Sequence, residues 1–180
     1  MKYEAKAWKE TEGACLRNFN EQAQIDSVNG ALALRPQIEK IIDQIWEEGF
    51  DGIYFIGIGG TYASSMQVEV YMRGRSKLPV FVENAAEFLT TGNKKFTNKS
   101  VVIISSVSGN TKEMVELVDR VHEKGAKVFS FIDNPGTTLT QPDKQDYLIV
   151  YPMNEQLKFY MVANYLMYKN CLLYTSPSPR

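Results

Sequence analysis

The feature of this sequence that most constrains its fold is a repeated alternation of short apolar runs with segments of helical periodicity. Each apolar run is followed by turn-forming residues and then by apolar side chains spaced as on one face of a helix. We predict strands at residues 53–56, 80–82, 101–105, 128–132 and 147–150. Strands that alternate with helices form a parallel sheet covered on both faces, so the chain is predicted to be a doubly wound α/β domain.

The segments between the strands have the spacing of helices with one buried face. The first helix is predicted to begin near Asp26, with Ser27 as its cap, and to end at Gly49, because isoleucines recur between them at helical spacing. Gly125 is the predicted end of the helix that follows the third strand. Further helices are predicted at residues 62–72, 85–91, 111–124 and 155–169.

Composition and charge exclude several classes of protein. The 180 residues, 44% of them hydrophobic, suffice for one globular domain with a sizeable core. A formal net charge of -1 gives no general attraction to nucleic acid or to an anionic membrane. No run has membrane-spanning length, and we expect a cytoplasmic protein. Cys15 and Cys171 match no metal or redox spacing and are expected to be ordinary thiols. We expect no metal and no cofactor.

The stretch SSVSGNT, residues 105–111, places hydroxyl side chains and a glycine where a buried strand passes into a helix. Ser106, Ser108 and Thr111 can donate hydrogen bonds to a phosphate, and Gly109 lets the backbone approach it. The helix that follows adds free amides and the positive end of its dipole. The sequence therefore predicts an anion site. The alternative is that Ser108 or Asn110 only caps the helix, with Glu113 completing a capping box.

The turn GIGGTYASS follows the first predicted strand and permits two interpretations. Gly57 and Gly59 suggest a dinucleotide fold with Glu83 as the ribose acceptor, but Tyr62 occupies the third glycine position of that motif. The other interpretation is that Thr61 and the amides near Gly60 cover the same phosphate as the serine loop.

Together, the Gly-Gly-Thr turn, the segment ENAAEF and the loop SVSGNT resemble the sugar isomerase (SIS) family of phosphosugar-binding proteins. The match spans residues 50–152, and GALALRPQIEKI with the closing helix looks most like the branch of fructosamine-phosphate deglycases and the isomerase part of glucosamine-6-phosphate synthase. The resemblance implies a flavodoxin-like five-stranded fold with three layers. It also implies phosphate ligation by Thr61, Ser106, Ser108 and Thr111, with close approach at Gly60 and Gly109. Val107 departs from the family pattern, since many members have glutamine there.

Several acidic residues and one histidine are candidates for acid–base groups. Glu87 follows a strand end and could contact a sugar hydroxyl or brace the neighbouring loop. Glu83 could equally cap the next helix, and Asp133 is expected to order its own turn. His122 lies late in a helix and is expected at the surface. In two-module relatives the second module supplies most catalytic groups, so catalysis is expected only in a longer protein.

The predicted domain organisation is an arm at residues 1–25, an SIS domain at 26–152, a closing helix at 153–170 and a tail at 171–180. The tail CLLYTSPSPR resembles translated sequencing adapter, so we expect the natural chain to continue differently; a disordered terminus is the alternative. Apolar residues lie on more than one face of the closing helix, as in a homodimer, in a contact with a second SIS module or in a core helix: Phe159, Tyr160, Tyr165, Met167 and Tyr168. A sugar phosphate is the expected partner, acted on or sensed by a regulator.

Overall fold

The computed structural model describes residues 20–175 and contains a five-stranded parallel sheet with the strand order β2-β1-β3-β4-β5. The strands are β1 (Gly52–Gly57), β2 (Val80–Asn84), β3 (Ser100–Ser106), β4 (Lys127–Ile132) and β5 (Tyr147–Val150). The order reverses between β1 and β3, and this switch point is where open α/β sheets bind ligands. The predicted flavodoxin-like sheet is confirmed.

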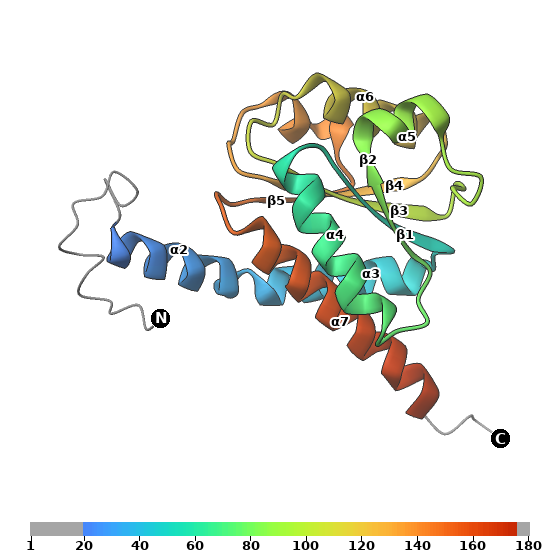
Figure 1. Ribbon diagram of the computed structural model, residues 1–180, viewed down its shortest axis with the longest axis horizontal. Helices are drawn as coiled ribbons and strands as arrows, with labels where there is room; N and C mark the ends of the chain where they lie inside the picture. Colours follow the sequence, from blue (N-terminus) through green and yellow to red (C-terminus); the bar gives the residue numbers. More distant parts are fainter. Residues whose placement is uncertain (1–19, 176–180) are drawn as a thin grey trace, which may run out of the picture.

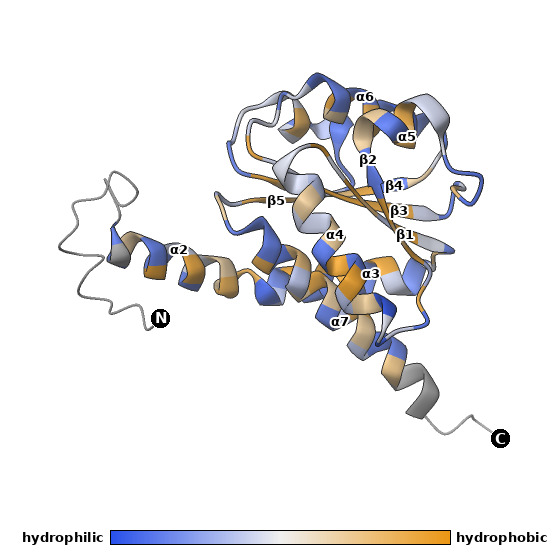
Figure 2. Ribbon diagram, in the orientation of Figure 1, coloured by the Kyte–Doolittle hydropathy of each residue, from blue (hydrophilic) through white to orange (hydrophobic). Residues whose placement is uncertain are grey.

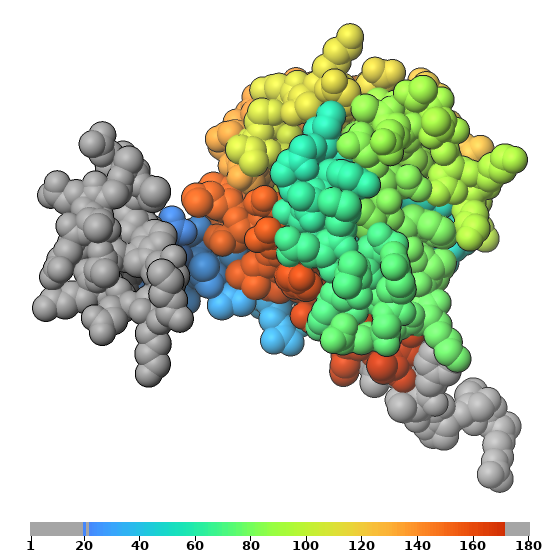
Figure 3. Space-filling view, viewed as in Figure 1, coloured from blue at the N-terminus to red at the C-terminus, as the bar shows by residue number. Residues whose placement is uncertain are grey.

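Helices cover both faces of the sheet and form the outer layers of the predicted three-layer fold (Figure 1). One face is covered by α3 (Arg35–Glu48), α4 (Gly60–Arg73) and α7 (Glu155–Thr175). The other is covered by α5 (Ala85–Thr91) and α6 (Lys112–Glu123). The helix α2 (Glu21–Ala33) extends away from the sheet (Figure 1), and in the space-filling view part of it lies beside α7 (Figure 3).

The central strands are apolar because both of their faces are buried. In β1, Ile53 and Phe55 pack against the α3, α4 and α7 layer, whereas Tyr54 and Ile56 pack against the α5 and α6 layer. The strands are accordingly among the most hydrophobic parts of the ribbon in Figure 2. Burying an aliphatic side chain contributes about 1.5–3 kcal/mol, which is why an uninterrupted apolar run predicts a central parallel strand.

The N-terminal helical segment differs from the prediction. It consists of two helices that meet at Leu34 rather than one helix ending at Gly49. Pro36 lies in the first turn of α3, and proline has no amide to donate to the preceding helical turn. Asn20, not Ser27, caps α2, because its side-chain oxygen accepts from the Ala23 amide at 3.0 Å.

The other elements agree with the predicted order, with small changes at their ends. The helix at 85–91 and the strand at 147–150 have the predicted bounds. The loop after β4 contains the short 3-10 helices η2 (Thr138–Thr140) and η3 (Pro142–Lys144). Helix α7 continues to Thr175, so the segment predicted as tail is helical over its first part. Residues 1–19, with Cys15, and residues 176–180 lie outside the described chain.

None of the helices between residues 20 and 175 is long and apolar enough to cross a membrane.

Candidate functional site

A hollow of about 500 Å³ lies at the carboxyl ends of β1 and β3, at the switch point of the sheet. Five of the six predicted phosphate-site residues line it: Gly60, Thr61, Ser106, Ser108 and Thr111. Its wall also includes Ile58, Ser105, Val107, Met114, Asn134 and Glu155. None of these lining residues is a lysine or an arginine, so an anion bound here would be held by neutral donors and helix ends.

The serine loop is ordered by hydrogen bonds among its own groups. Ser106 Oγ accepts from the Gly109 amide at 3.1 Å, which leaves the Ser106 hydroxyl hydrogen for another acceptor. The hydroxyls of Ser108 and Thr111 lie 3.1 Å apart, so one donates to the other. The loop therefore presents hydroxyl groups to the hollow in a fixed arrangement.

Gly109 does not line the hollow, but its backbone conformation and its contact with the next loop explain why the serine loop has glycine here. Its φ is +65°, which L side chains rarely adopt, and an added Cβ would lie 2.0 Å from Thr137 Oγ1. Glycine is required because the loop turns tightly against Thr137 in the segment after β4.

Two helices begin at the hollow without a side-chain cap. The N-cap of α4 is Gly59, which has no side chain, and the N-cap of α6 is Thr111, whose side chain makes no capping hydrogen bond. By contrast, asparagine side chains cap α2 and α5. First-turn amides without a side-chain cap need another acceptor, and an anion or water can provide it.

The capping alternative for the serine loop is wrong in this structure. Asn110 Oδ1 accepts from the Thr138 amide at 2.9 Å and from its hydroxyl at 2.8 Å, so this side chain holds η2 instead of α6. Ser108 Oγ accepts from the Asn110 amide at 3.3 Å, within the loop. The polar side chains of the loop therefore do not cap α6, and the amides of its first turn have no side-chain acceptor among the described residues.

Thr61 lies at the start of α4, and its side chain is engaged locally. Its hydroxyl donates to the Ile58 carbonyl at 3.0 Å and accepts from the Ile58 amide at 3.2 Å. Thr61 thus shapes the glycine turn, and contact with a ligand would require its hydroxyl hydrogen to turn away from Ile58.

Ser105 contributes to the wall of the hollow a buried hydroxyl without a partner within residues 20–175. It is 1% exposed and lines the hollow, and its hydroxyl has no hydrogen-bond partner among the described residues. A buried hydroxyl without a partner costs about 1–3 kcal/mol, so such groups mark a site for a ligand or water. Ser130 on the neighbouring strand also lacks a partner within residues 20–175, but it does not line the hollow.

Glu155 and Asn134 were not singled out from the sequence, yet both line the hollow. Glu155 is the first residue of α7, and its Oε1 lies 3.5 Å from the Oγ of Ser64 in α4. Asn134 Nδ2 donates to the Val107 carbonyl at 2.7 Å. A sequence signal for both existed, because each follows a predicted strand by a few residues and the carboxyl ends of parallel strands share one edge.

The acid–base candidates chosen from the sequence do not line the hollow. Glu87 is exposed on α5, and Glu83 accepts from Asn93 Nδ2 at 2.7 Å. The helix after β2 is capped by Asn84 rather than Glu83. Asp133 binds the Met153 amide and Lys158 instead of ordering its own turn. His122 lies beside Asp146 at the opposite edge of the sheet, with His122 Nε2 3.0 Å from Asp146 Oδ2.

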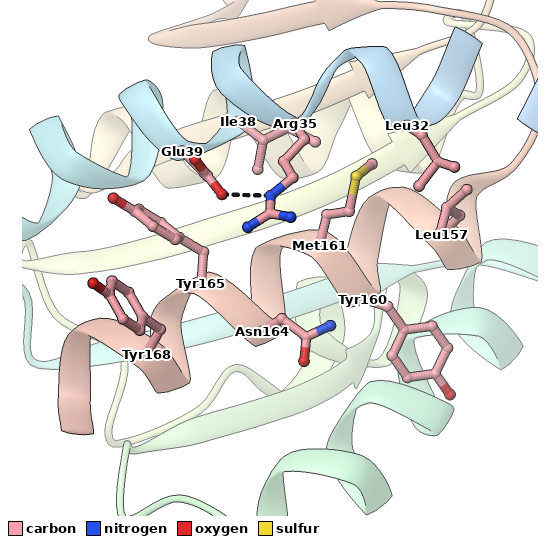
Figure 4. A pocket seen from close by; sticks show the side chains of 10 residues that line it. All are labelled: Leu32, Arg35, Ile38, Glu39, Leu157, Tyr160, Met161, Asn164, Tyr165 and Tyr168. Atoms are coloured by element: carbon pink, nitrogen blue, oxygen red, sulfur yellow. Dashed lines mark hydrogen bonds and ion pairs between the residues drawn. The ribbon is translucent and has the colours of Figure 1, made fainter. Parts of the chain in front are cut away.

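A larger hollow, of about 690 Å³, lies between α2, α3 and α7 (Figure 4). Four of its polar side chains already pair within the chain: Arg35 with Glu39, Asn164 with Tyr71, and Tyr165 with Asp43. Because size alone does not make a ligand site, we regard the hollow at the switch point as the candidate site and this one as a groove between helices.

Within the described part of the chain, no group of three or more His, Cys, Asp or Glu side chains is placed to hold a metal ion.

The sheet order and the layers place the chain in the doubly wound α/β class. The model of the SIS domain family matches residues 50–174, and the chain belongs to that family.

The proteins to which this chain is similar have names that refer to fructose-6-phosphate aminotransferases or to a sugar isomerase domain. The chain is 30% identical over 91 residues to a glutamine–fructose-6-phosphate aminotransferase (isomerizing) of Fusobacterium nucleatum, covering 51% of this chain and 15% of the relative. Its fold is similar to the C-terminal domain of glucosamine-fructose-6-phosphate aminotransferase from Francisella tularensis, with a TM-score of 0.64 and 15% identity over 86% of this chain and 44% of the other. The sugar isomerase domain of an RpiR transcription factor from Sphaerobacter thermophilus gives a TM-score of 0.63 and 13% identity over 84% and 87% of the two chains.

Proposed function

We propose that this chain is a phosphosugar-binding module that holds the phosphate of its ligand on the Ser-x-Ser-Gly-x-Thr loop. The observation that carries the proposal is the convergence of loop hydroxyls with two helix starts that lack side-chain caps. The partnerless hydroxyl of Ser105 supports it, because a phosphate oxygen would supply the missing acceptor. Neutral donors at a helix N-terminus suffice to bind a phosphate.

The sugar would extend from the phosphate toward α7, where Glu155 is the acidic residue of the hollow wall. A carboxylate beside the serine loop disfavours a second phosphate but can accept hydrogen bonds from sugar hydroxyls or an amino group. Glu155 therefore replaces Glu87 as the candidate acid–base group of this module. Turnover, by deglycation or aldose–ketose isomerisation, belongs in this proposal to a longer protein with a second module.

A phosphosugar sensor is the second candidate function, because the fold also resembles the sugar isomerase domain of a transcription factor. The two candidates share the same ligand site and differ in what the site controls. A dinucleotide-binding module has less support, since Glu83 already accepts from Asn93 and Tyr62 stands at the third glycine position.

The groove between α2, α3 and α7 is the surface that we propose for contact with a second SIS module, in the same natural chain or in a second copy. It is lined by Leu32, Leu157 and Met161, and Tyr168 is 54% exposed. Exposed apolar side chains at Ile25 and Val28 extend it along α2. Sedimentation of this chain, alone and with a Tyr168→Glu change, separates a homodimer from a monomer that needs a second module.

A cytoplasmic location remains a prediction.

The experiment that tests the proposed function is thermal unfolding of the purified chain with inorganic phosphate, fructose 6-phosphate, glucosamine 6-phosphate or NADH. A ligand that binds only the folded state adds about 2.7 kcal/mol at 100 times its dissociation constant, a shift of several degrees. We expect stabilisation by the sugar phosphates and not by NADH. Stabilisation by NADH alone would favour the dinucleotide interpretation.

A Ser106→Ala/Ser108→Ala double variant completes the test. Each lost hydrogen bond to a charged group removes about 1.5–3 kcal/mol, so affinity should fall by about 100-fold or more. The matched control is Ser130→Ala, which removes a buried serine hydroxyl outside the hollow. Equal affinity in the double variant and the control would remove the phosphate site from this loop.

A further inference from the structure

The segment that joins β5 to α7, residues Tyr151 to Asn154, has an unusual backbone and leads directly to Glu155. Met153 and Asn154 have φ values of +60° and +57°, in the left-handed region that non-glycine residues rarely occupy. Such conformations persist only where the surroundings hold them. The position of Glu155 in the hollow wall therefore depends on what holds this segment.

A buried ion pair holds the segment from the side of the sheet. Lys158 is 0% exposed, and its Nζ donates to the Tyr151 carbonyl at 2.9 Å and to Asp133 Oδ1 at 3.3 Å. Asp133 Oδ2 accepts from the Met153 amide at 2.8 Å. The two side chains thus bind the segment at two points, and Lys158 lies one helical turn after Glu155.

Helix α2 holds the same segment from the other side. The Tyr151 hydroxyl donates to the Ser27 carbonyl at 2.9 Å, and Asn154 Nδ2 donates to Ser27 Oγ at 2.6 Å. An added Cβ at Gly30 would lie 2.0 Å from the Tyr151 hydroxyl, so the helix packs closely against this ring. The segment is enclosed between α2 and the ion pair.

From these contacts we infer that Lys158, together with Asp133, is a positioning residue for the hollow: the pair holds the segment from Tyr151 to Asn154 and thereby places Glu155 beside Ser64 and the serine loop. This inference rests on the proposed function. Stability alone does not explain the pair, because replacing a buried ion pair by apolar side chains is often neutral or stabilising. Burial lowers the pKa of Lys158, and the Asp133 and Glu155 carboxylates oppose this effect.

We call the hold of the Lys158–Asp133 pair on residues 151–154 the clamp. It is tested first without any ligand, by amide hydrogen exchange of residues 151–155. Lys158→Met removes one partner, and Asp133→Leu/Lys158→Met replaces both with apolar side chains and leaves no unpaired buried charge. Lys127→Met is the control, since Lys127 pairs with Glu48 at the opposite edge of the sheet. We expect exchange of this segment to accelerate about tenfold or more in the first two variants only. Unchanged protection in the folded double variant would overturn the clamp.

The role in ligand binding is tested by the ratio of the dissociation constants for inorganic phosphate and fructose 6-phosphate. This ratio isolates the contribution of the sugar from that of the serine loop. We expect Lys158→Met, Asp133→Leu/Lys158→Met and Glu155→Gln each to reduce it about tenfold, with phosphate affinity retained. Combining Lys158→Met with Glu155→Gln should reduce it no further, because Lys158 acts through Glu155.

An additive effect of the two changes, or an unchanged ratio in the folded apolar double variant, would show that the pair serves only stability and would overturn the inference. A wild-type chain that binds neither phosphate nor fructose 6-phosphate would overturn the proposed function and the ligand role of Lys158. The exchange measurement separates that failure from failure of the clamp.

Discussion

Polar groups are paired differently at the two edges of the sheet, the one where the strands begin and the one where they end. At the edge where the strands begin, Asp51 accepts from the hydroxyls of Thr97 and Ser100, and Glu48 pairs with Lys127 and with the Tyr147 hydroxyl. Asp146 accepts from the Val128 amide at 2.8 Å and contacts His122. These polar side chains are engaged with one another or with a backbone amide, although the buried Tyr54 hydroxyl lacks a partner within residues 20–175.

At the edge where the strands end, polar groups are left available. The helices α4 and α6 begin without side-chain caps, and the Ser105 hydroxyl lacks a partner within the described chain. Within residues 20–175, polar groups are thus paired where the strands begin and left without side-chain partners where they end, and our proposal assigns these available donors to a ligand. Strained or unsatisfied groups gathered in one place favour a functional interpretation of that place.

Among the changes that test this difference between the two edges, Gly109→Ala is expected to have the largest effect on stability and on binding. A left-handed backbone costs a non-glycine residue about 1–2 kcal/mol, and overpacking against Thr137 adds about 1–3 kcal/mol. Urea unfolding should therefore show a loss of about 2–5 kcal/mol, and phosphate binding should be lost. The control is Gly136→Ala, where φ is +73° but an added Cβ meets no atom within 4 Å, so only the backbone cost applies. Equal losses in both variants would contradict the close approach to Thr137.

A second comparison uses the two partnerless serines. Ser105→Ala removes a hydroxyl that lines the hollow, and Ser130→Ala removes one that does not. We expect the first change to weaken phosphate binding about tenfold or more, since a hydrogen bond to a charged group contributes about 1.5–3 kcal/mol. The second should leave affinity unchanged, and neither should lower stability appreciably. Titration calorimetry decides the point; identical affinities would mean that Ser105 binds no ligand.

Val107 offers a way to sharpen the comparison by adding a donor to the open edge. The side chain lines the hollow and is 54% exposed, so a longer residue can be accommodated without disturbing the core. Val107→Gln should raise affinity for a sugar phosphate about threefold to tenfold, because one added hydrogen bond contributes about 0.5–1.5 kcal/mol. Val107→Leu is the matched control without a donor. An equal gain in both variants would attribute the effect to packing.

The smallest effect is expected at the paired edge, from the pH dependence of stability. The hydrogen bond from Lys127 lowers the pKa of Glu48, so its contribution is present above the ordinary carboxyl pKa and is lost as pH falls through the lowered value. Exposed pairs contribute about 0.2–1 kcal/mol, so the acid loss of stability should be slightly smaller in Glu48→Gln. Urea unfolding across the acid range measures this difference. Ligand affinity should not change, and a change would contradict the separation of the two edges.

The sequence predicted most of the fold because the relevant signals are local. Apolar runs such as Val101 to Ile104 have two buried faces in a parallel sheet, and helical spacing marks the covering layers. The serine loop was predicted as an anion site for the same reason, since strand, loop and helix are consecutive in the chain. The helix boundary at Leu34 was not predicted, because the apolar spacing runs on without interruption across Pro36, which lies in the first turn of α3.

Local sequence patterns suffice to predict the order of the strands and helices along the chain, the layered class and the residues of one hydroxyl-rich loop. The tertiary structure alone decided which distant groups join that loop: Asn134 and Glu155 in the wall, Thr137 against Gly109, and the pair of Lys158 with Asp133 below. The physical reason is that periodicity reports which face of an element is buried, but not which side chains from other strand ends meet there. That meeting depends on the strand order β2-β1-β3-β4-β5, which no local pattern records.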